Sequence, residues 1–400
     1  MSEMSYLEKL LDGVEVEWVT LGSMADIGTG SSNRQDESEN GIYPFYVRSK
    51  NILKSDTFEF DEVAIVIPGE GGIGDIFHYV EGKYALHQRA YRIRITTNAV
   101  DTKFLYYFMS SSFKQYILTK SVGATAISIR KPMLEGFKVP IPSPDNPEKS
   151  LAIQSEIVRI LDKFTALTAE LTAELNMRKK QYNYYRDQLL SFEDGEVEWK
   201  ALGTICQIGD GNHSSKYPKA NEMIEQGIPF IRGTNMVNGT ICNQDMKYIS
   251  KEKHNELKKG HLKAFDVLIA NRGEVGKVAY VPEGYSGSNL NSQLAWLRAN
   301  PEIIINRYLF FILCSSTIQN KLSGEGGALQ QLTIKNIKNI QIPVPSITVQ
   351  SNIVSFLDKF DSLTNSISEG LPREIELRQK QYEYYRDLLF SFPKPDTVSN

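Results

Sequence analysis

The amino-acid sequence repeats one plan twice, and this internal repeat limits the possible folds more than any other feature. Segments of the first half recur in the second half in the same order. The matched pairs are 16–30 with 197–211, 154–164 with 350–360, and 180–187 with 380–387. The last two pairs are far more alike than the blocks that precede them. The chain therefore contains two diverged blocks, each followed by a similar connector.

The repeat is also nearly cyclic. Residues 6–18 resemble residues 185–199, which span the end of the first connector and the start of the second block. The chain thus begins with the tail of a connector. This order predicts an approximate two-fold axis and termini that lie close together.

The connectors have the apolar spacing of long helices. Apolar residues of the first connector alternate in steps of three and four, which is typical of a coiled-coil seam. These residues are Ile157, Ile160, Phe164, Leu167 and Leu171. The second connector repeats the pattern, and two such helices related by a two-fold axis run antiparallel. Gly370 and Pro372 interrupt the second connector and predict a break there.

The two blocks have the pattern of mixed α/β domains. Short apolar runs bounded by Gly, Pro and Asn predict strands at 63–67, 90–95 and 266–270. Amphipathic spacing predicts helices at 104–118 and 307–322. The expected fold is α+β, with two mixed α/β domains joined by two long antiparallel coiled-coil helices in a pseudo-two-fold cyclic repeat. The expected segments are an N-terminal helix at 1–12, domains at 13–150 and 196–346, and connector helices at 151–195 and 347–400.

Catalytic and metal-binding motifs are not found in the sequence. The Gly69–Gly74 segment fits the GxGxxG pattern, but a strand rather than a helix is expected after it, so a nucleotide site is not predicted. The five histidines show no paired metal-ligand spacing, and the three cysteines are scattered. We expect no catalytic residue, metal or cofactor in this chain. No apolar run is long enough to span a bilayer, and the expected location is the cytoplasm.

Polar turn residues recur at corresponding positions in the two blocks. Arg, Lys, Asn and Gln side chains match base edges in the major groove, and Gly and Ser allow close approach to phosphates. The candidate DNA-binding residues of the first block are Ser31, Ser32, Asn33, Arg34, Arg48, Lys50, Asn51, His87, Gln88 and Arg89. Those of the second block are Asn212, His213, Lys216, Arg232, Asn235, Arg272, Asn291 and Gln293. The alternative is that polar residues simply populate turns.

Charge is distributed unequally between the blocks. The whole chain has a formal net charge of −3, which excludes indiscriminate electrostatic binding of nucleic acid by the entire surface. Residues 13–142 carry 14 Lys and Arg against 15 Asp and Glu, a net charge of −1. Residues 196–345 carry 17 against 13, a net charge of +4.

The motifs around the connectors resemble those of a known family. Each block ends in a Pro-x-Pro step, followed by a Gln and a helix that ends in Gln-Tyr-x-Tyr-Tyr-Arg-Asp. This arrangement resembles the specificity subunit of type I restriction–modification enzymes, and the resemblance covers essentially the whole chain. The segments 167–175 and 378–387 look like the IC subgroup of that family.

The resemblance implies a function for each part. Each block would be a target recognition domain that reads one half of a bipartite, asymmetric site on double-stranded DNA. The chain itself would be non-catalytic. Its connectors would dock two adenine-methylating subunits and the motor/nuclease subunits, which carry S-adenosylmethionine, ATP and magnesium.

The connector tyrosines are the candidate partner-binding residues. They are Tyr182, Tyr184, Tyr185, Tyr382, Tyr384 and Tyr385. The alternative is that these tyrosines only pack the two connectors together. Two other functions stay open from sequence alone: a coiled-coil scaffold with two protein-binding heads, and an enzyme with an unrecognised site in one block.

Overall fold

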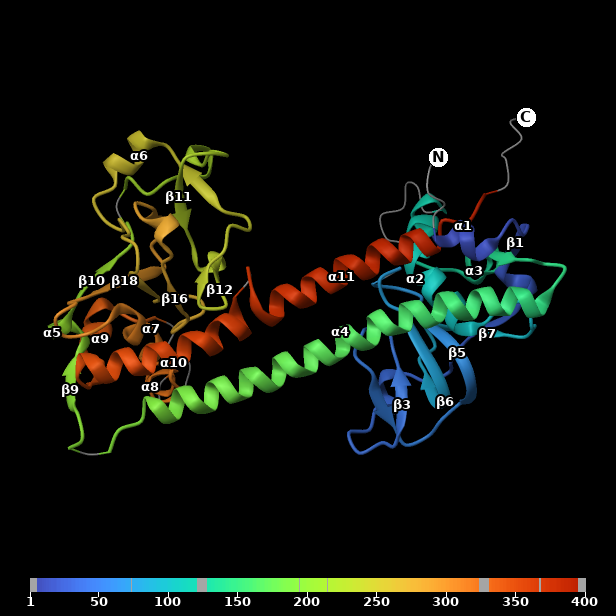
Figure 1. The fold of residues 1–400 in the computed structure, drawn as a ribbon, viewed down its shortest axis with the longest axis horizontal. Helices are drawn as coiled ribbons and strands as arrows, with labels where there is room; N and C mark the ends of the chain where they lie inside the picture. Colours follow the sequence, from blue (N-terminus) through green and yellow to red (C-terminus); the bar gives the residue numbers. More distant parts are fainter. Residues whose placement is uncertain are drawn as a thin grey trace. The chain divides into compact units, whose positions relative to one another are not determined.

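The computed structural model divides into two compact units (Figure 1). The first unit comprises residues 1–169 and 377–400, and the second comprises residues 170–376. The residues described are 6–72, 74–120, 128–193, 195–213, 215–323, 331–366 and 368–394. Residues 1–5 of the expected N-terminal helix lie outside this set. None of the described helices has the length and apolar character needed to cross a membrane.

A six-stranded sheet forms the centre of the first unit. Its strands, in spatial order, are β2 (Ala25–Thr29), β7 (Ala90–Ile95), β5 (Phe60–Pro68), β6 (His78–Leu86), β3 (Tyr43–Tyr46) and β4 (Leu53–Ser55). All neighbours are antiparallel except β3 and β6, which run parallel with Phe45 opposite Ala85. A separate pair joins β1 (Val16–Thr20) to β8 (Lys138–Pro142). The strands expected at 63–67 and 90–95 are confirmed by β5 and β7.

Helices and both chain ends complete the core of the first unit. The helices are α1 (Tyr6–Leu11), η1 (Leu21–Ser23), η2 (Arg34–Asp36), α2 (Thr102–Lys120) and α3 (Lys131–Glu135). Leu7 of α1 shares one apolar cluster with Phe390 and Phe392 from the C-terminal segment. The indole N–H of Trp18 donates to the carbonyl of Pro393 at 2.7 Å. The two terminal segments therefore pack together, as the cyclic repeat predicts.

The second unit has the same strand connections in shorter elements. A four-stranded sheet has the order β10 (Cys206–Asp210), β18 (Leu294–Ala299), β15 (Val267–Ala270) and β16 (Val278–Tyr280). A three-stranded sheet has the order β14 (Lys247–Ile249), β11 (Ile228–Ile231) and β17 (Asn289–Leu290). The remaining pairs are β9 (Glu198–Ala201) with β19 (Gln341–Val344) and β12 (Met236–Val237) with β13 (Thr240–Ile241). The parallel β11–β17 pair corresponds to the parallel β3–β6 pair of the first unit.

Short helices cover the sheets of the second unit. They are α5 (Leu202–Ile205), η3 (Ala220–Glu222), η4 (Gly233–Asn235), α6 (Lys251–Glu256), η5 (Glu283–Tyr285), α7 (Asn306–Cys314), α8 (Ser316–Ser323) and α9 (Ile334–Asn339). The single helix expected at 307–322 is wrong, because α7 and α8 are separate. Ser315 between them has extended backbone angles, and its hydroxyl donates to the carbonyl of Ile312 at 2.7 Å. This side-chain bond replaces the next helical one and ends α7.

The connectors are long helices, and the second one is interrupted. The first connector is the 43-residue helix α4 (Pro147–Leu189). The second consists of α10 (Ile347–Asn365) and α11 (Gly370–Leu389), which confirms the expected break. Gly370 has a φ of +74°, and a Cβ there would lie 2.4 Å from the carbonyl oxygen of Ser362. Pro372 falls in the first turn of α11, where its missing N–H costs little.

Aromatic side chains form the predicted seam within each unit. In the first unit, Phe164 of α4 stacks on Tyr385 of α11 with ring centroids 5.4 Å apart. In the second unit, Tyr185 of α4 contacts Phe356 and Phe360 of α10 at 5.8 and 5.7 Å. The expected segment boundaries themselves stay a prediction.

A buried glutamine ties each α/β domain to its connector helix. The Gln154 side chain accepts from the N–H of Asp101 at 2.8 Å and donates to the carbonyl of Ala99 at 3.0 Å. The Gln350 side chain likewise accepts from the N–H of Ile305 at 2.9 Å and donates to the carbonyl of Ile303 at 3.0 Å. Both glutamines are fully buried. One amide thus satisfies two backbone groups of the loop that leads into α2 or α7.

Replacing Gln154 with Leu should lower the free energy of unfolding by about 2–6 kcal/mol. The substitution leaves a buried N–H and a buried carbonyl without partners, and each costs about 1–3 kcal/mol. Urea unfolding followed by circular dichroism measures the change. The control is Ser155→Ala on the exposed side of the same helix, expected within about 0.5 kcal/mol of the parent. A Gln154→Leu variant as stable as this control would contradict the role given to the Gln154 amide.

Candidate nucleic-acid interface

A glycine at the same position of each unit lets two polar loops meet. An added Cβ on Gly30 would lie 1.9 Å from the carbonyl oxygen of Leu86, and one on Gly211 would lie 1.8 Å from that of Asn291. Neither position can hold a side chain without moving backbone. The glycines therefore bring the loop after β2 or β10 against the turn after β6 or β17.

The turn on the other side of this contact contains the same hydrogen bond in both units. The His87 Nδ1 accepts from the N–H of Arg89 at 3.0 Å, and the Asn291 Oδ1 accepts from the N–H of Gln293 at 3.1 Å. Both accepting side chains are buried. The two residues that receive this bond, Arg89 and Gln293, are exposed. The turn thus presents the long polar side chain of Arg89 or Gln293 to solvent.

His87 can serve as an acceptor because its environment keeps the ring neutral. Burial lowers the pKa of His87, and the positive charges of Arg48 and Arg89 lower this pKa further. A neutral imidazole offers one nitrogen as an acceptor, as the bond from Arg89 requires. Histidine and asparagine are therefore interchangeable for this bond, although only histidine titrates.

Several predicted residues of the first unit surround one hollow. The hollow has a volume of about 350 Å³, and Arg34, Arg48 and His87 line it. Glu70 also lines it, and its carboxylate lies 3.1 Å from both the Arg48 and the Arg89 guanidinium groups. The side chain of Arg34 is 85% exposed. Basic groups from the segments after β2, β3 and β6 therefore meet here, with one carboxylate between two of them.

The other predicted residues of the first unit lie on the same loops. The hydroxyls of Ser31 and Ser32 donate to Glu59. The Gln88 amide donates to the Asn33 side chain at 2.5 Å. The remaining two residues, Lys50 and Asn51, are exposed after β3.

The second unit gathers its first loop around a different hollow. Asn212, His213 and Lys216 line a volume of about 380 Å³ together with Lys258 and Lys259. The His213 ring lies 3.2 Å from the Asp210 carboxylate. The two lysines come from the segment between α6 and β15, which has no counterpart in the first unit. Comparison of the two copies missed them for that reason, although the lysine-rich run 251–263 could have identified them.

The other predicted residues of the second unit are not all exposed. Asn235 is fully buried, and its amide donates to the carbonyls of Cys242 and Gln244, so it holds the loop after β11. The Arg232 guanidinium donates to the Asp245 carbonyl at 2.6 Å. Arg272 is exposed and pairs through its backbone with Gln331.

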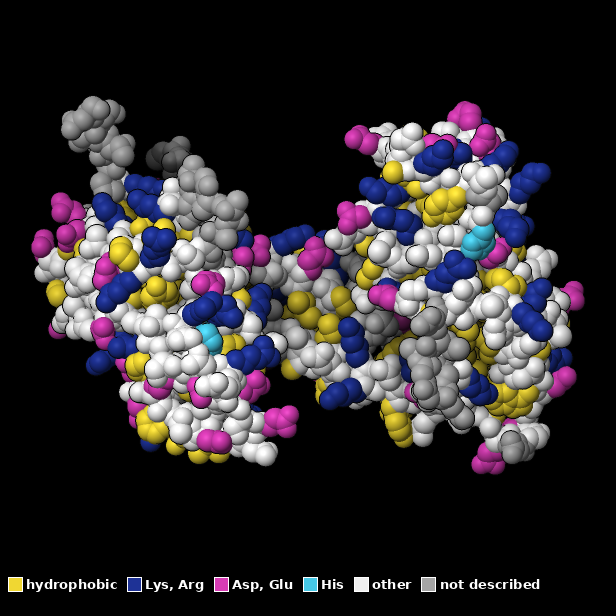
Figure 2. Space-filling model, turned by 180° about the vertical axis from the view of Figure 1, so that it is seen from behind, with side chains coloured by type: hydrophobic (Ala, Val, Ile, Leu, Met, Phe, Trp, Pro, Cys, Tyr) yellow, Lys and Arg dark blue, Asp and Glu magenta, His cyan; other side chains and the backbone are white. Residues whose placement is uncertain are grey.

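Basic side chains are interspersed with acidic ones on both units. On the face that Figure 2 shows, Lys and Arg lie among Asp and Glu without one continuous basic field. This mixed surface agrees with the net charge of −3. Charge alone therefore does not define the interface. Its assignment to these loops rests on their geometry.

The connector tyrosines divide into buried and exposed members. Tyr182 is 6% exposed, whereas Tyr184 and Tyr384 are 59% and 66% exposed. Tyr185 and Tyr385 lie against the phenylalanines of the seam, and Tyr382 is half-buried. The matched pair Tyr184 and Tyr384 is thus the most available to a partner.

Comparisons with known proteins converge on one family. The type I restriction modification DNA specificity domain matches residues 13–178 and 195–377. The chain is 42% identical over 418 residues to the EcoR124I/EcoR124II specificity subunit of Escherichia coli, with both chains covered completely. It is 31% identical to a putative type I restriction enzyme specificity subunit of Haemophilus influenzae, over 97% of this chain and 98% of that one. The solved S subunit from M. genitalium has a TM-score of 0.60 at 18% identity, covering 98% of this chain and 100% of that one.

The titration of His87 should make the first-unit loop pH-dependent. Its folded-state pKa lies below the unfolded value near 6.5, so its stabilising contribution is present above that value and is lost as the pH falls through the lowered pKa. Hydrogen exchange, corrected for intrinsic rates, should show less protection around residues 87–90 at pH 5.5 than at pH 7.5. His87→Asn should abolish this difference, because Asn291 makes the same bond without titrating. An unchanged difference in that variant would contradict the assignment.

Proposed function

Because the chain belongs to the family of type I restriction–modification specificity subunits, we propose that each of its two units reads one half of a bipartite, asymmetric DNA target. Specificity subunits recognise DNA and are the non-catalytic components of their complexes. The proposal assigns one half-site to the first unit and the other to the second. The observation that supports this proposal is the loop contact that occurs in both units. The two copies of this scaffold present different side chains.

The two loop sets differ in the groups they offer to DNA. The turn of the first unit presents Gln88 and Arg89, and that of the second presents Ser292 and Gln293. Arginine pairs best with guanine, and glutamine pairs best with adenine, through two hydrogen bonds in the major groove. Different side chains on one scaffold would therefore give two different half-sites, which makes the target asymmetric.

The connectors are proposed to dock the partner subunits. Two methylating subunits would each use one of the matched tyrosine positions, and the motor/nuclease subunits would join through them. Large exposed aromatic side chains are frequent anchors of protein interfaces, and Tyr184 and Tyr384 are related by the repeat. In this proposal, S-adenosylmethionine, ATP and magnesium bind to the partner subunits.

Replacing one exposed turn residue should relax one half-site only. Mapping of methylated adenines in cells with the full complex identifies the target. Gln293→Ala should weaken the preference for one base pair of one half-site by about 1–3 kcal/mol, and Arg89→Ala should do so in the other half-site. Gln207→Ala, exposed in the second unit outside the loops that carry the candidate DNA-binding residues, should leave the methylated sequence unchanged.

Three other outcomes would count against this assignment. A uniform loss across all sequences would mark the residue as a phosphate contact. A change in both half-sites would contradict the assignment of one unit to each half. Complete absence of sequence-specific methylation with the parent chain would favour the scaffold alternative.

Tyr184→Asp combined with Tyr384→Asp should abolish co-purification of the methylating subunit. A carboxylate at each anchor would have to be desolvated in the interface without a partner. The chain itself should keep its circular dichroism spectrum and thermal unfolding, because both side chains are exposed. Ile42→Asp, at a side chain that is 78% exposed outside the connectors, is the matched control and should still co-purify. Full retention of the methylating subunit by the double variant would show that the tyrosines are not the docking site.

A further inference from the structure

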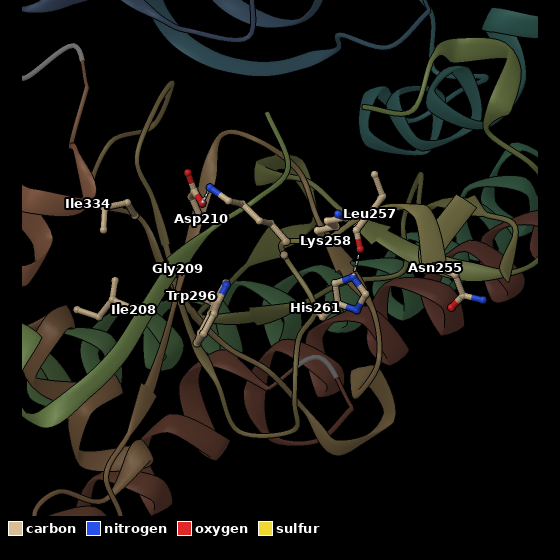
Figure 3. Close-up of a pocket in the computed structure, with 11 residues that line it drawn as sticks. Ile208, Gly209, Asp210, Asn255, Leu257, Lys258, His261, Trp296 and Ile334 are labelled. Atoms are coloured by element: carbon tan, nitrogen blue, oxygen red, sulfur yellow. Dashed lines mark hydrogen bonds and ion pairs between the residues drawn. The ribbon is translucent and has the colours of Figure 1, made fainter. Parts of the chain in front are cut away.

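One hollow of the second unit lies over Trp296, at a register position that Arg92 occupies in the first unit. It has a volume of about 790 Å³, and Figure 3 shows residues that line it. Asp210, Lys258, Lys259 and Trp296 are among the residues that line it. All of them belong to the second unit. Lys258 and Lys259 also line the neighbouring hollow beside Asn212 and His213, so the two hollows are continuous with the predicted DNA-binding loop.

The corresponding position in the first unit is filled by an ion cluster. Register places Arg92 opposite Gly28 in the first unit and Trp296 opposite Gly209 in the second. The Arg92 guanidinium lies 2.6 Å from Asp26 and 3.3 Å from Glu62, so its donors are used internally. The Trp296 indole N–H is buried and has no hydrogen-bond partner among the described residues. An indole N–H in this state needs an acceptor, and an acceptor can come from a ligand.

Two ammonium groups stand at the rim of this hollow. The Lys259 side chain is 62% exposed, and its Nζ lies 3.3 Å from the Asp210 carboxylate. Lys258 is also exposed. Such a weak surface ion pair yields readily to a phosphate, which then frees one Asp210 oxygen, while the other faces the His213 ring at 3.2 Å. The hollow thus offers two cations outside, with one donor and one acceptor inside.

We propose that this hollow is the subsite for one nucleotide of the half-site read by the second unit. Lys258 and Lys259 hold the phosphate, while the Trp296 indole N–H and the Asp210 carboxylate face the base edge. A donor beside an acceptor complements adenine, which shows N7 as an acceptor and the N6 amino group as a donor in the major groove. Guanine presents two acceptors there, and a carboxylate would repel one of them. The inference rests on the proposed function and adds an adenine contact unique to the second unit.

The test measures binding of the full chain, co-expressed with its methylating subunit, to duplex DNA. The duplexes carry the mapped target and its single base-pair substitutions. Lys258→Ala with Lys259→Ala should weaken binding to every duplex and reduce the slope of log affinity against log salt by about 1, as expected for one phosphate. The control pair Lys251→Ala with Lys263→Ala removes the same charge from exposed flanks of the same segment and should have a much smaller effect.

Trp296→Phe tests the base contact separately, since it keeps the aromatic ring and removes the N–H. The preference for adenine at one position of the second half-site should fall by about 5- to 150-fold, with all other positions unchanged. Asp210→Ala should relax the same position. Thermal unfolding of each variant establishes that the second unit is folded.

Several results would overturn the inference. If the two lysine pairs had equal effects, Lys258 and Lys259 would contribute only general positive charge and would not mark a phosphate subsite. A parent chain that binds its target specifically, with Trp296→Phe and Asp210→Ala indistinguishable from it, would refute the adenine contact and leave the proposed function standing. A parent chain without specific binding in the complex would refute both.

Discussion

The buried amides of Gln154 and Gln350 are the interactions on which the rest of each unit depends. Each amide satisfies two backbone groups of the loop before α2 or α7. A carboxylate two turns further along each connector adds a second tie. Asp162 accepts from Lys103 at 2.8 Å, and Asp358 accepts from Arg307 at 2.6 Å. These two ties both hold the domain to its connector helix. The loops that carry the candidate DNA-binding residues are not part of them.

This attachment explains why the connectors are alike and the domains are not. A change in a connector residue that faces the domain disturbs buried polar groups, which is costly. A change at a loop tip alters only exposed side chains, provided that the close contact at Gly30 or Gly211 remains. The pair His87 and Asn291 illustrates this freedom, because two unlike side chains accept the same backbone bond. Specificity can thus diverge without loss of the scaffold.

Sequence alone predicts the repeated parts of this molecule well, because repetition gives two independent views of one element. The connector helices, the break before Gly370 and the packing of the terminal segments follow from the matched residues. The burial of Asn235 could not be predicted, since its exposure depends on the loop that folds over it. The division between α7 and α8 depends on one serine hydroxyl. Lys258 and Lys259 were missed because an inserted segment has no matching copy.

The two units also differ in how their charges are used, and this difference bears on DNA binding. In the first unit, Glu70 already pairs with Arg48 and Arg89, so a phosphate there must displace a carboxylate. Such an exchange gains little free energy, because one ion pair replaces another. In the second unit, Lys258 is exposed, Lys259 is only loosely paired, and residues 196–345 carry a net charge of +4. Phosphate binding there, as proposed, would break the Lys259–Asp210 pair alone and would release counterions. If the two units bind DNA as proposed, the second would supply more of the electrostatic affinity, and the arginines of the first would contribute mainly through base contacts.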